Sequence, residues 1–401
     1  MKSVAIVGGS LAGSRAAQEL RAQGYDGLLL MIGEERHRPY DRPPLSKDFL
    51  AGTTGRDELD LLDAGEDTEL DLHQRTGVRA ERLDPAAGTL TLSDGAELAV
   101  DGVVIATGGR ARRLPGTAGI TGVHVLRTLD DAVGLRAELT AGSPRVVVVG
   151  AGFIGAEVAS TCRRLGLEVT VLEALGTPLA PVLGADLGGI CAGLHADHGT
   201  ELRCGTAVDR LSIAEDGGSP RVTGVHLADG GWLPADVVVV GIGMTPETGW
   251  LADSGLILDD GVRTDHGLVT AFPNVVAIGD VARYDGPERP VRHEHWTNAS
   301  DQAGVAVANL LAGHTVRRYV PSGYVWSDQY SCTIQLAGHP LPTDELTIVD
   351  GDVDERRFVA TYLREGATVA VAAMNNAKLF NRMRRQLRRD AEPAGNAAVT
   401  A

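Results

Sequence analysis

The chain has 401 residues, and since a domain typically contains about 150 residues, this length predicts two or three domains. With 43% apolar and 22% charged residues, the composition is typical of a large globular protein and excludes a disordered or fibrous one. The formal net charge of −16 argues against nonspecific binding of nucleic acid, and no apolar run approaches the ~18 residues that a membrane-spanning helix requires.

The first predicted element is a β-strand over residues 4–7, which follows Met1 and Lys2. A cation followed by an apolar run is also how a secretory signal peptide begins. This run ends at Gly8 and Gly9, however, and is too short for the apolar region of such a peptide. We therefore expect a cytoplasmic protein that does not insert into a membrane.

A glycine-rich turn, GGSLAG (8–13), follows this strand and leads into a predicted helix over 15–21. In dinucleotide-binding folds the first glycine allows a tight turn, the second admits a pyrophosphate and the third lets the helix pack on the strand. The helix N-terminus then attracts the anion. Gly8 and Gly13 keep two of these positions, and Ser10 replaces the second glycine with a small hydroxyl that can donate to the phosphate. We predict a dinucleotide site here.

The acidic partner of this first site follows the next predicted strand, 28–32. A carboxylate at that place accepts hydrogen bonds from ribose hydroxyls. We assign Glu35 to this role and keep Glu34 as the alternative, the unused glutamate being a solvated loop charge.

The same pattern recurs later in the chain, with a strand over 146–149, the turn GAGFIG (150–155) and a helix over 157–164. All three glycines, Gly150, Gly152 and Gly155, are present. Glu173 follows the next strand, 169–172, without a flanking Arg or Lys, and would repel a 2′-phosphate. The second motif therefore predicts a site for NADH rather than NADPH.

Apolar runs at 103–106 and 237–240 end in glycines and predict buried parallel strands that close on a ligand at their carboxyl ends. A third run, 275–278, leads into Gly279 and Asp280. A carboxylate there suits a ribityl hydroxyl, although an isolated Gly-Asp is more often a turn. Because a nicotinamide delivers a hydride that a second cofactor must receive, we predict FAD in the first site and NADH in the second.

The pattern changes after Pro321, where short strands are predicted at 324–330, 333–336, 357–363 and 368–373, and the tail 391–401 is expected to be frayed. The segment 378–389 carries six cations and no acid, which is usual for a solvated helix face. These cations are Lys378, Arg382, Arg384, Arg385, Arg388 and Arg389.

Neither a metal site nor a local disulfide is expected. The four cysteines include no C-x-x-C pair, so ordinary core or surface thiols are the simplest interpretation. His293 and His295 lie two positions apart without a third ligand, which favours packing over metal binding.

Together these residues resemble the FAD-dependent ferredoxin reductases of the putidaredoxin reductase and dioxygenase type, within the glutathione-reductase-like superfamily. The likeness covers about residues 2–389, and its most specific signature is PYDRPPLSK (39–47). Supporting motifs are ATGGR (106–110), LRTLDD (126–131) and WSDQY (326–330).

The resemblance implies an α/β fold with two Rossmann-like nucleotide-binding domains of the glutathione-reductase type and a C-terminal α+β domain. The implied domains are a discontinuous FAD-binding domain (1–108 and 244–320), an NADH-binding domain (109–243) and a C-terminal domain (321–401) that faces the flavin and the ferredoxin.

The resemblance also assigns cofactor contacts. Those to FAD are Glu35, Lys47, Val78, Arg127, Asp280 and Trp296, with Arg42 of the same loop reaching the pyrophosphate as a guanidinium suits phosphate. Those to NADH are Gly152, Ile154, Glu157, Glu173 and Gly243. The strand-end and turn residues that complete the cofactor-binding set are Gly8, Ser10, Gly13, Ala106, Thr107, Gly108, Gly150, Gly155, Gly241 and Gly279.

Three residues are implied to take part in catalysis. Lys47 and Glu157 are expected to form an ion pair near the flavin N5, beneath the nicotinamide, where a cation stabilises negative charge on the reduced flavin. A surface lysine after a turn is the alternative for Lys47. Trp326 occupies the place of an aromatic between the flavin and the docked electron acceptor. Trp296 is expected to shield the flavin, stack on the nicotinamide or pack in the core.

The predicted function is that of an NADH:ferredoxin oxidoreductase, in which a hydride passes from NADH to FAD and single electrons pass to an iron–sulfur ferredoxin that serves an oxygenase or haem monooxygenase. The helix over 302–311 lacks the basic residues that some relatives present to an acidic ferredoxin. Arg317 and Arg318, or the basic segment 378–389, could replace them.

Two alternatives are kept. One is a rubredoxin reductase or an NADH oxidase or peroxidase relative, although a peroxidase of this superfamily needs a cysteine near position 40 and 36–50 contains none. The other is a flavoprotein for redox sensing or interaction, similar to the apoptosis-inducing-factor branch.

Overall fold

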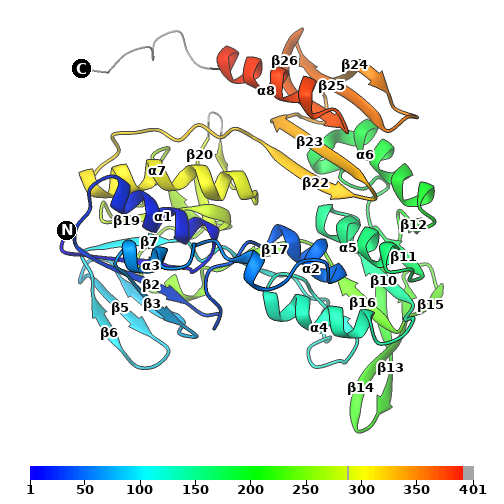
Figure 1. Ribbon diagram of the computed structural model, residues 1–401, viewed down its shortest axis with the longest axis horizontal. Helices are drawn as coiled ribbons and strands as arrows, with labels where there is room; N and C mark the ends of the chain where they lie inside the picture. Colours follow the sequence, from blue (N-terminus) through cyan, green and yellow to red (C-terminus); the bar gives the residue numbers. More distant parts are fainter. Residues whose placement is uncertain (287–288, 392–401) are drawn as a thin grey trace. The chain divides into compact units, whose positions relative to one another are not determined.

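The computed structural model describes residues 1–286 and 289–391 (Figure 1). The chain divides into two compact units, and each is assembled from separate stretches. The first unit contains Met1–Asp41, Arg56–Arg110 and Met244–Pro321, and the second contains Arg42–Gly55, Ala111–Gly243 and the described residues from Ser322 onward. The stretch 42–55 thus belongs to the second unit, whereas the domain boundaries predicted from the sequence group it with 1–108.

A five-stranded parallel sheet forms the centre of the first unit, in the order β19-β7-β1-β2-β3. Its strands are β1 (Ser3–Val7), β2 (Leu28–Gly33), β3 (Leu72–Thr76), β7 (Gly102–Ile105) and β19 (Val275–Ala277). Strands β7 and β19 are buried along their whole length, as in a sheet covered on both faces. Helices α1 (Leu11–Ala22) and α7 (Trp296–Ala312) share one apolar cluster with this sheet.

Smaller elements complete the first unit. They are α3 (Glu66–Glu69), an antiparallel sheet of β4 (Ala80–Asp84), β5 (Thr89–Leu92) and β6 (Glu97–Ala99), the sheet β18 (Val262–Thr264), β20 (Ala282–Asp285) and β21 (Pro290–Val291), and the 3-10 helices η2 (Asp57–Leu59), η3 (Gly249–Leu251) and η4 (Gly279–Val281). Strand β17 (Met244–Pro246) pairs with β8 (Gly109–Ala111), where the chain leaves the first unit and later returns to it.

The second unit contains another five-stranded parallel sheet, in the order β12-β11-β10-β16-β9. Its strands are β9 (Val123–His124), β10 (Val146–Val149), β11 (Val169–Leu172), β12 (Glu201–Arg203) and β16 (Val237–Val240). The helices of this part are η1 (Pro43–Ser46), α2 (Asp48–Ala51), α4 (Leu129–Leu139), α5 (Phe153–Arg164) and α6 (Ala180–Asp197). An antiparallel sheet of β13 (Val208–Asp216), β14 (Ser219–Leu227) and β15 (Trp232–Pro234) adjoins them.

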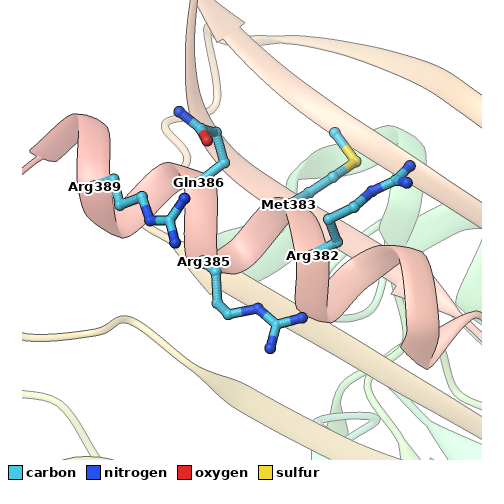
Figure 2. Close-up of a pocket in the computed structure, with 5 residues that line it drawn as sticks. All are labelled: Arg382, Met383, Arg385, Gln386 and Arg389. Carbon is cyan, nitrogen blue, oxygen red and sulfur yellow. The ribbon is translucent and has the colours of Figure 1, made fainter.

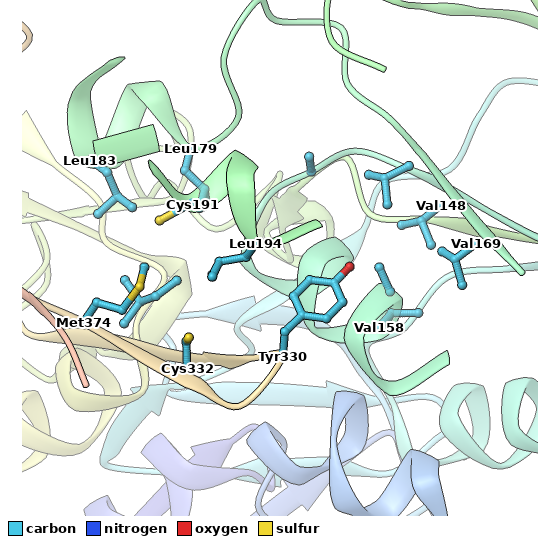
Figure 3. Packing of buried hydrophobic residues seen from close by; sticks show 14 of the residues in the cluster. Val148, Val158, Val169, Leu179, Leu183, Cys191, Leu194, Tyr330, Cys332 and Met374 are labelled. Carbon is cyan, nitrogen blue, oxygen red and sulfur yellow. The ribbon is translucent and has the colours of Figure 1, made fainter. Parts of the chain in front are cut away.

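The last part of the second unit is an antiparallel sheet in the order β22-β23-β26-β25-β24, followed by helix α8 (Ala377–Ala391). Its strands are β22 (Val325–Gln329), β23 (Cys332–Gly338), β24 (Glu345–Asp352), β25 (Arg357–Arg364) and β26 (Ala367–Met374). Tyr330, Cys332 and Met374 of this part pack with Leu183 and Leu194 of α6 in one apolar core (Figure 3).

The structure confirms the predicted α/β class, with a C-terminal antiparallel sheet after two parallel ones. The strands predicted at 146–149, 169–172 and 237–240 have these bounds. The helices after the glycine turns begin earlier than predicted, at Leu11 and Phe153, because the last residues of each turn already form the first helical turn.

Two further differences lie in the C-terminal part. Strand β24 was not predicted because it is an edge strand whose side chains are mostly exposed, so it lacks a buried alternating pattern. Ala391 ends α8 instead of belonging to a frayed tail, and the remainder of that predicted tail lies outside the described residues. In the part of the chain that the structure describes, no helix is long and apolar enough to cross a membrane.

Candidate functional site

The glycine turn of the first unit connects β1 to α1. Gly8 has φ of +123°, and a Cβ there would lie 2.1 Å from the Ala106 carbonyl oxygen, while a Cβ on Gly13 would lie 2.0 Å from the Gly8 carbonyl oxygen. Both positions therefore require glycine. Ser10, in contrast, is the extended residue before α1, with φ of −137°. The replacement of the second glycine by serine is compatible with the backbone because this position does not need a positive φ.

The glycine turn of the second unit connects β10 to α5 in the same way. A Cβ on Gly150 would lie 2.3 Å from the Gly241 carbonyl oxygen, and a Cβ on Gly155 would lie 2.0 Å from the Gly150 carbonyl oxygen. A Cβ on Gly152, at the start of α5, would have no heavy atom within 4 Å. The turn thus leaves open space at a helix N-terminus, which fits a pyrophosphate group.

Glu173 is fixed to this second turn by backbone hydrogen bonds. Its Oε2 accepts from the Ala151 N–H at 2.8 Å and its Oε1 accepts from the Leu175 N–H at 2.8 Å. Arg203 on the neighbouring β12 pairs with Glu201 at 2.8 Å. A carboxylate held against the glycine turn suits a ribose diol and opposes a phosphate on it.

The acidic residues after β2 have different partners. The Arg110 guanidinium lies 2.8 Å from Glu34 and also contacts Glu247. The Glu35 carboxylate accepts a hydrogen bond from the Tyr40 hydroxyl. Glu34 is therefore paired with a cation, whereas Glu35 is hydrogen-bonded to a hydroxyl.

Asp280 lies in the 3-10 helix η4, which follows β19, and a buried glutamine orients the start of this helix. The Gly279 N–H donates to Oε1 of Gln302 at 2.6 Å, and Gln302 on α7 is fully buried. At the start of the same helix, Trp296 Nε1 donates to Asp41 Oδ1 at 2.8 Å. Gln302 and Asp41 were not predicted as site residues, since nothing in their local sequence pattern marks these contacts.

The signature segment places Lys47 against Glu157 of α5, both in the second unit. Lys47 Nζ lies 2.8 Å from Glu157 Oε2, and the Glu157 side chain is only 4% exposed. The ion pair that the family resemblance implies is therefore present. A carboxylate this deeply buried requires compensating donors.

Two hydroxyls supply further donors to Glu157. Ser46 Oγ donates to Glu157 Oε2 at 2.5 Å, and Ser327 Oγ of β22 donates to Oε1 at 2.6 Å. Neither serine was predicted, although Ser46 lies within the signature and Ser327 follows Trp326. Both serines are far from Glu157 in the sequence, so the local pattern of apolar and polar residues does not indicate these hydrogen bonds.

Arg42 and Arg127 lie in the second unit as well. Arg42 Nη1 donates to the Arg127 carbonyl oxygen, and the Arg127 N–H donates to Asp131 Oδ2 at 3.1 Å. Thr128 and Asp131 form a capping box at the start of α4. Part of the motif over 126–131 is therefore the start of helix α4, and the Arg127 carbonyl of this motif also accepts a hydrogen bond from Arg42 of the signature segment.

Trp326 belongs to a layered aromatic cluster. Its ring stacks on Tyr324 with centroids 5.8 Å apart, and the Arg384 guanidinium of α8 lies 3.8 Å from the Tyr324 ring centre. Helix α8 buries Phe380 against its sheet. Its exposed cations are Lys378, Arg382, Arg385, Arg388 and Arg389.

Helix α8 also borders a surface hollow, shown in Figure 2, which is lined by Arg382, Met383, Arg385, Gln386 and Arg389. Arg385 and Arg389 are four positions apart and therefore lie on one helix face. We call the side of α8 that carries Arg385 and Arg389 its basic face. The neighbouring Arg384 contacts the Tyr324 ring that stacks on Trp326, so α8 itself packs beside this aromatic pair.

In the described part of the chain, the histidines and cysteines do not come together as metal ligands. His293 Nδ1 lies 2.6 Å from the Tyr284 hydroxyl and stacks on His295. Within residues 1–286 and 289–391, no three His, Cys, Asp or Glu side chains are grouped as a metal site, and the cysteines are free thiols.

Comparison with known proteins identifies the family. The model of the pyridine nucleotide-disulphide oxidoreductases matches residues 2–303, and that of the reductase C-terminal domain matches residues 324–400. The chain belongs to this oxidoreductase family. Its relatives include a 5,5'-dehydrodivanillate O-demethylase ferredoxin reductase subunit from a Sphingobium species, which is 38% identical over 93% of this chain and 90% of that protein.

The likeness extends to putidaredoxin reductase. The Pseudomonas putida enzyme is 34% identical over 94% of this chain and 90% of its own length. The crystal structure of a covalent putidaredoxin reductase–putidaredoxin complex contains a chain that superimposes with a TM-score of 0.90 at 32% identity, covering 96% of this chain and 92% of that one. The oxidoreductase therefore shares both the fold and the family that the signature segment indicated.

Proposed function

We propose that this oxidoreductase is an NADH-dependent, FAD-containing ferredoxin reductase that supplies an oxygenase or a haem monooxygenase. The observation that carries the proposal is the likeness, over 93% and 94% of the chain, to reductases of a demethylase system and of putidaredoxin. Two dinucleotide turns in one polypeptide support it, because a hydride donor and a hydride acceptor must both bind.

We assign FAD to the first unit and NADH to the glycine turn of the second. The turn Gly8–Gly13 holds a pyrophosphate, Glu35 a ribose, and Asp280 the ribityl chain, with Gln302 keeping the Asp280 turn in place. In the second unit, Glu173 selects the unphosphorylated ribose of NADH.

When bound, FAD accepts a hydride from NADH and releases its electrons one at a time. The residues of the chain position and tune this exchange without a general acid or base. Lys47 supplies a positive charge that stabilises negative charge on the flavin, and Glu157 fixes the Lys47 ammonium through the buried ion pair.

We further propose that the acceptor is an acidic ferredoxin that docks on Trp326 and the basic face of α8. The six cations of this helix stand in a chain of net charge −16, so they form a local attractive field on a surface that otherwise repels an anion. The free cysteines support a reducing compartment, and we place the reaction in the cytoplasm.

Anaerobic stopped-flow mixing tests the function. The purified holoprotein should show a flavin spectrum, be reduced by NADH faster than by NADPH, and then reduce an acidic ferredoxin. A protein that binds no flavin, or that NADH does not reduce, would overturn the proposal.

The second mixing step also separates the alternatives. Fast transfer to rubredoxin only would indicate a rubredoxin reductase, and fast transfer to oxygen an oxidase. A long-lived NADH-reduced complex that no ferredoxin reoxidises would indicate a redox-sensing flavoprotein.

A further inference from the structure

Strand β22 presents different residues on its two faces. Trp326 is partly exposed and Asp328 exposed, whereas Ser327 and Gln329 are 0% and 1% exposed. Because successive side chains of a strand point to opposite faces, the strand that carries Trp326 also places two polar side chains in the interior.

On the buried face of β22, Ser327 contacts the carboxylate of Glu157. Ser327 Oγ donates to Oε1 at 2.6 Å, while Lys47 and Ser46 both contact Oε2. Gln329 Nε2 donates to Ser327 Oγ at 3.0 Å. Since the hydroxyl oxygen accepts from Gln329, its proton is directed to Glu157.

This division of donors fixes the rotation of the carboxylate. With Oε1 held by Ser327, Oε2 is turned to the Lys47 ammonium, and a rotation of the carboxylate out of this plane would break buried hydrogen bonds. The loss of Ser327 would leave Oε1 without the donor described here, which is costly in a dry interior, whereas Oε2 has two donors.

We propose that Ser327, oriented by Gln329, is a positioning residue for hydride transfer. It sets the Glu157 carboxylate and, through it, the Lys47 ammonium. This inference rests on the proposed function of the Lys47–Glu157 pair. It also makes β22 serve both half-reactions, with Trp326 on the acceptor side and Ser327 on the donor side.

The first test compares Ser327→Ala with Thr333→Ala. Thr333 is a matched control because it lies in the hairpin β22–β23 and its hydroxyl, like that of Ser327, donates to a carboxylate. The acceptor is Asp328 at 2.7 Å, and this hydrogen bond is exposed. In the holoprotein, Ser327→Ala should lower the limiting rate of flavin reduction by NADH roughly tenfold, as misplaced groups do, with less than about a twofold change in NADH Kd, whereas Thr333→Ala should change neither. Equal rates for Ser327→Ala and wild type would overturn the inference.

A double-mutant cycle separates positioning from general strand support. If Ser327 acts through Glu157, Ser327→Ala should have no further effect on the reduction rate in a Glu157→Ala background. The same cycle can be measured by thermal unfolding of the holoprotein. Ser327→Ala alone should lower Tm by roughly 2–4 °C, and it should lower Tm much less when Glu157 is already replaced by alanine. Additive losses in both readouts would show a merely structural role.

The two proposals fail in different ways. If NADH does not reduce the wild-type flavin, the proposed function is wrong, and the unfolding cycle still decides whether Ser327 supports Glu157. If the wild type is reduced normally and the cycle is additive, the function stands and the role of Ser327 is wrong.

Discussion

At the scale of single residues, two carboxylates of this oxidoreductase have fully defined hydrogen bonds. Glu173 is held by two backbone N–H groups, and Glu157 by a lysine and two serines. Each carboxylate is oriented by groups of the chain itself, which is the condition under which a charge discriminates between ligands or stabilises a transition state.

Replacing Glu173 tests cofactor selection. Glu173→Arg removes an acceptor for the ribose hydroxyls and introduces a cation that favours a 2′-phosphate. We expect the KM for NADH to rise roughly 10- to 100-fold, since hydrogen bonds to charged groups are worth about 1.5–3 kcal/mol, and that for NADPH to fall. Steady-state kinetics with both nucleotides provide the measurement, with Glu201→Arg on the neighbouring strand as control. An unchanged ratio of the two KM values would refute the assignment.

Replacing Lys47 tests the buried ion pair. Lys47→Met leaves the Glu157 carboxylate buried without its cation, which should cost about 3 kcal/mol of unfolding free energy and slow flavin reduction by at least about 100-fold. Arg164→Met is the matched control, because Arg164 pairs with Asp48 at 3.0 Å between the same two segments, but with side chains 49% and 56% exposed. Denaturant unfolding should place this control within about 1 kcal/mol of wild type. Equal losses for the two variants would contradict the prediction.

At the scale of elements, a cluster of buried polar side chains joins the turn between β22 and β23 to α6 and to the loop that connects α6 to β12. The Tyr330 hydroxyl lies 2.8 Å from His195 Nδ1 and donates to Thr200 Oγ1 at 2.9 Å, and the His198 ring stacks on Tyr330. Tyr330 follows β22 directly, so this cluster anchors the strand that bears Trp326 and Ser327. Burial lowers the pKa of His195 to about 4.

This shift predicts a pH dependence of stability. His195 is neutral in the fold, while the unfolded chain takes up its proton below about pH 6.5. Stability should therefore fall as pH decreases from about 6.5 to about 4, by about 3 kcal/mol in total, and His195 should contribute no further slope below that. Chemical unfolding across this range should show a shallower slope for His195→Gln than for wild type. A substitution at the exposed His314 serves as control, and an unaltered slope in His195→Gln would contradict the prediction.

At the scale of the whole molecule, charge is unevenly distributed along the chain. The described part of 378–391 contributes Lys378 and five arginines to a protein of net charge −16. Such a field acts on the encounter with a charged partner and is screened over about 10 Å at 0.1 M salt.

The basic face of α8 should therefore control the ferredoxin half-reaction. Arg385→Glu together with Arg389→Glu should raise the KM for an acidic ferredoxin roughly tenfold at low salt and weaken its dependence on ionic strength. Reduction of the flavin by NADH is the internal reference. Arg210→Glu on β13, which changes the charge by two units against four for the double variant, should leave the ferredoxin KM unaltered. Salt titrations of ferredoxin reduction measure both, and identical KM values for the double variant and the control would exclude α8 as the docking face.

The sequence by itself determined the parts of this protein that local chemistry specifies. Gly8, Gly13, Gly150 and Gly155 are required by tight turns between neighbouring elements, and the strands before them are short apolar runs. Such features repeat at a recognisable spacing, so both glycine turns and the central strands of both parallel sheets were predictable, whereas β3, β9 and β12 were not predicted. The Lys47–Glu157 pair was implied by the family resemblance and not by local pattern.

Only the tertiary structure decided which side chains hold these groups in place. Ser46 and Ser327 reach Glu157 from 111 and 170 positions away, and Gln302 reaches Gly279 from another element. Strand β24 was likewise found only in the fold, because its ladder with β25 needs no buried alternation. A hydrogen bond between distant segments depends on how the chain packs, and a serine or glutamine looks the same in the sequence whether or not packing has given it a partner.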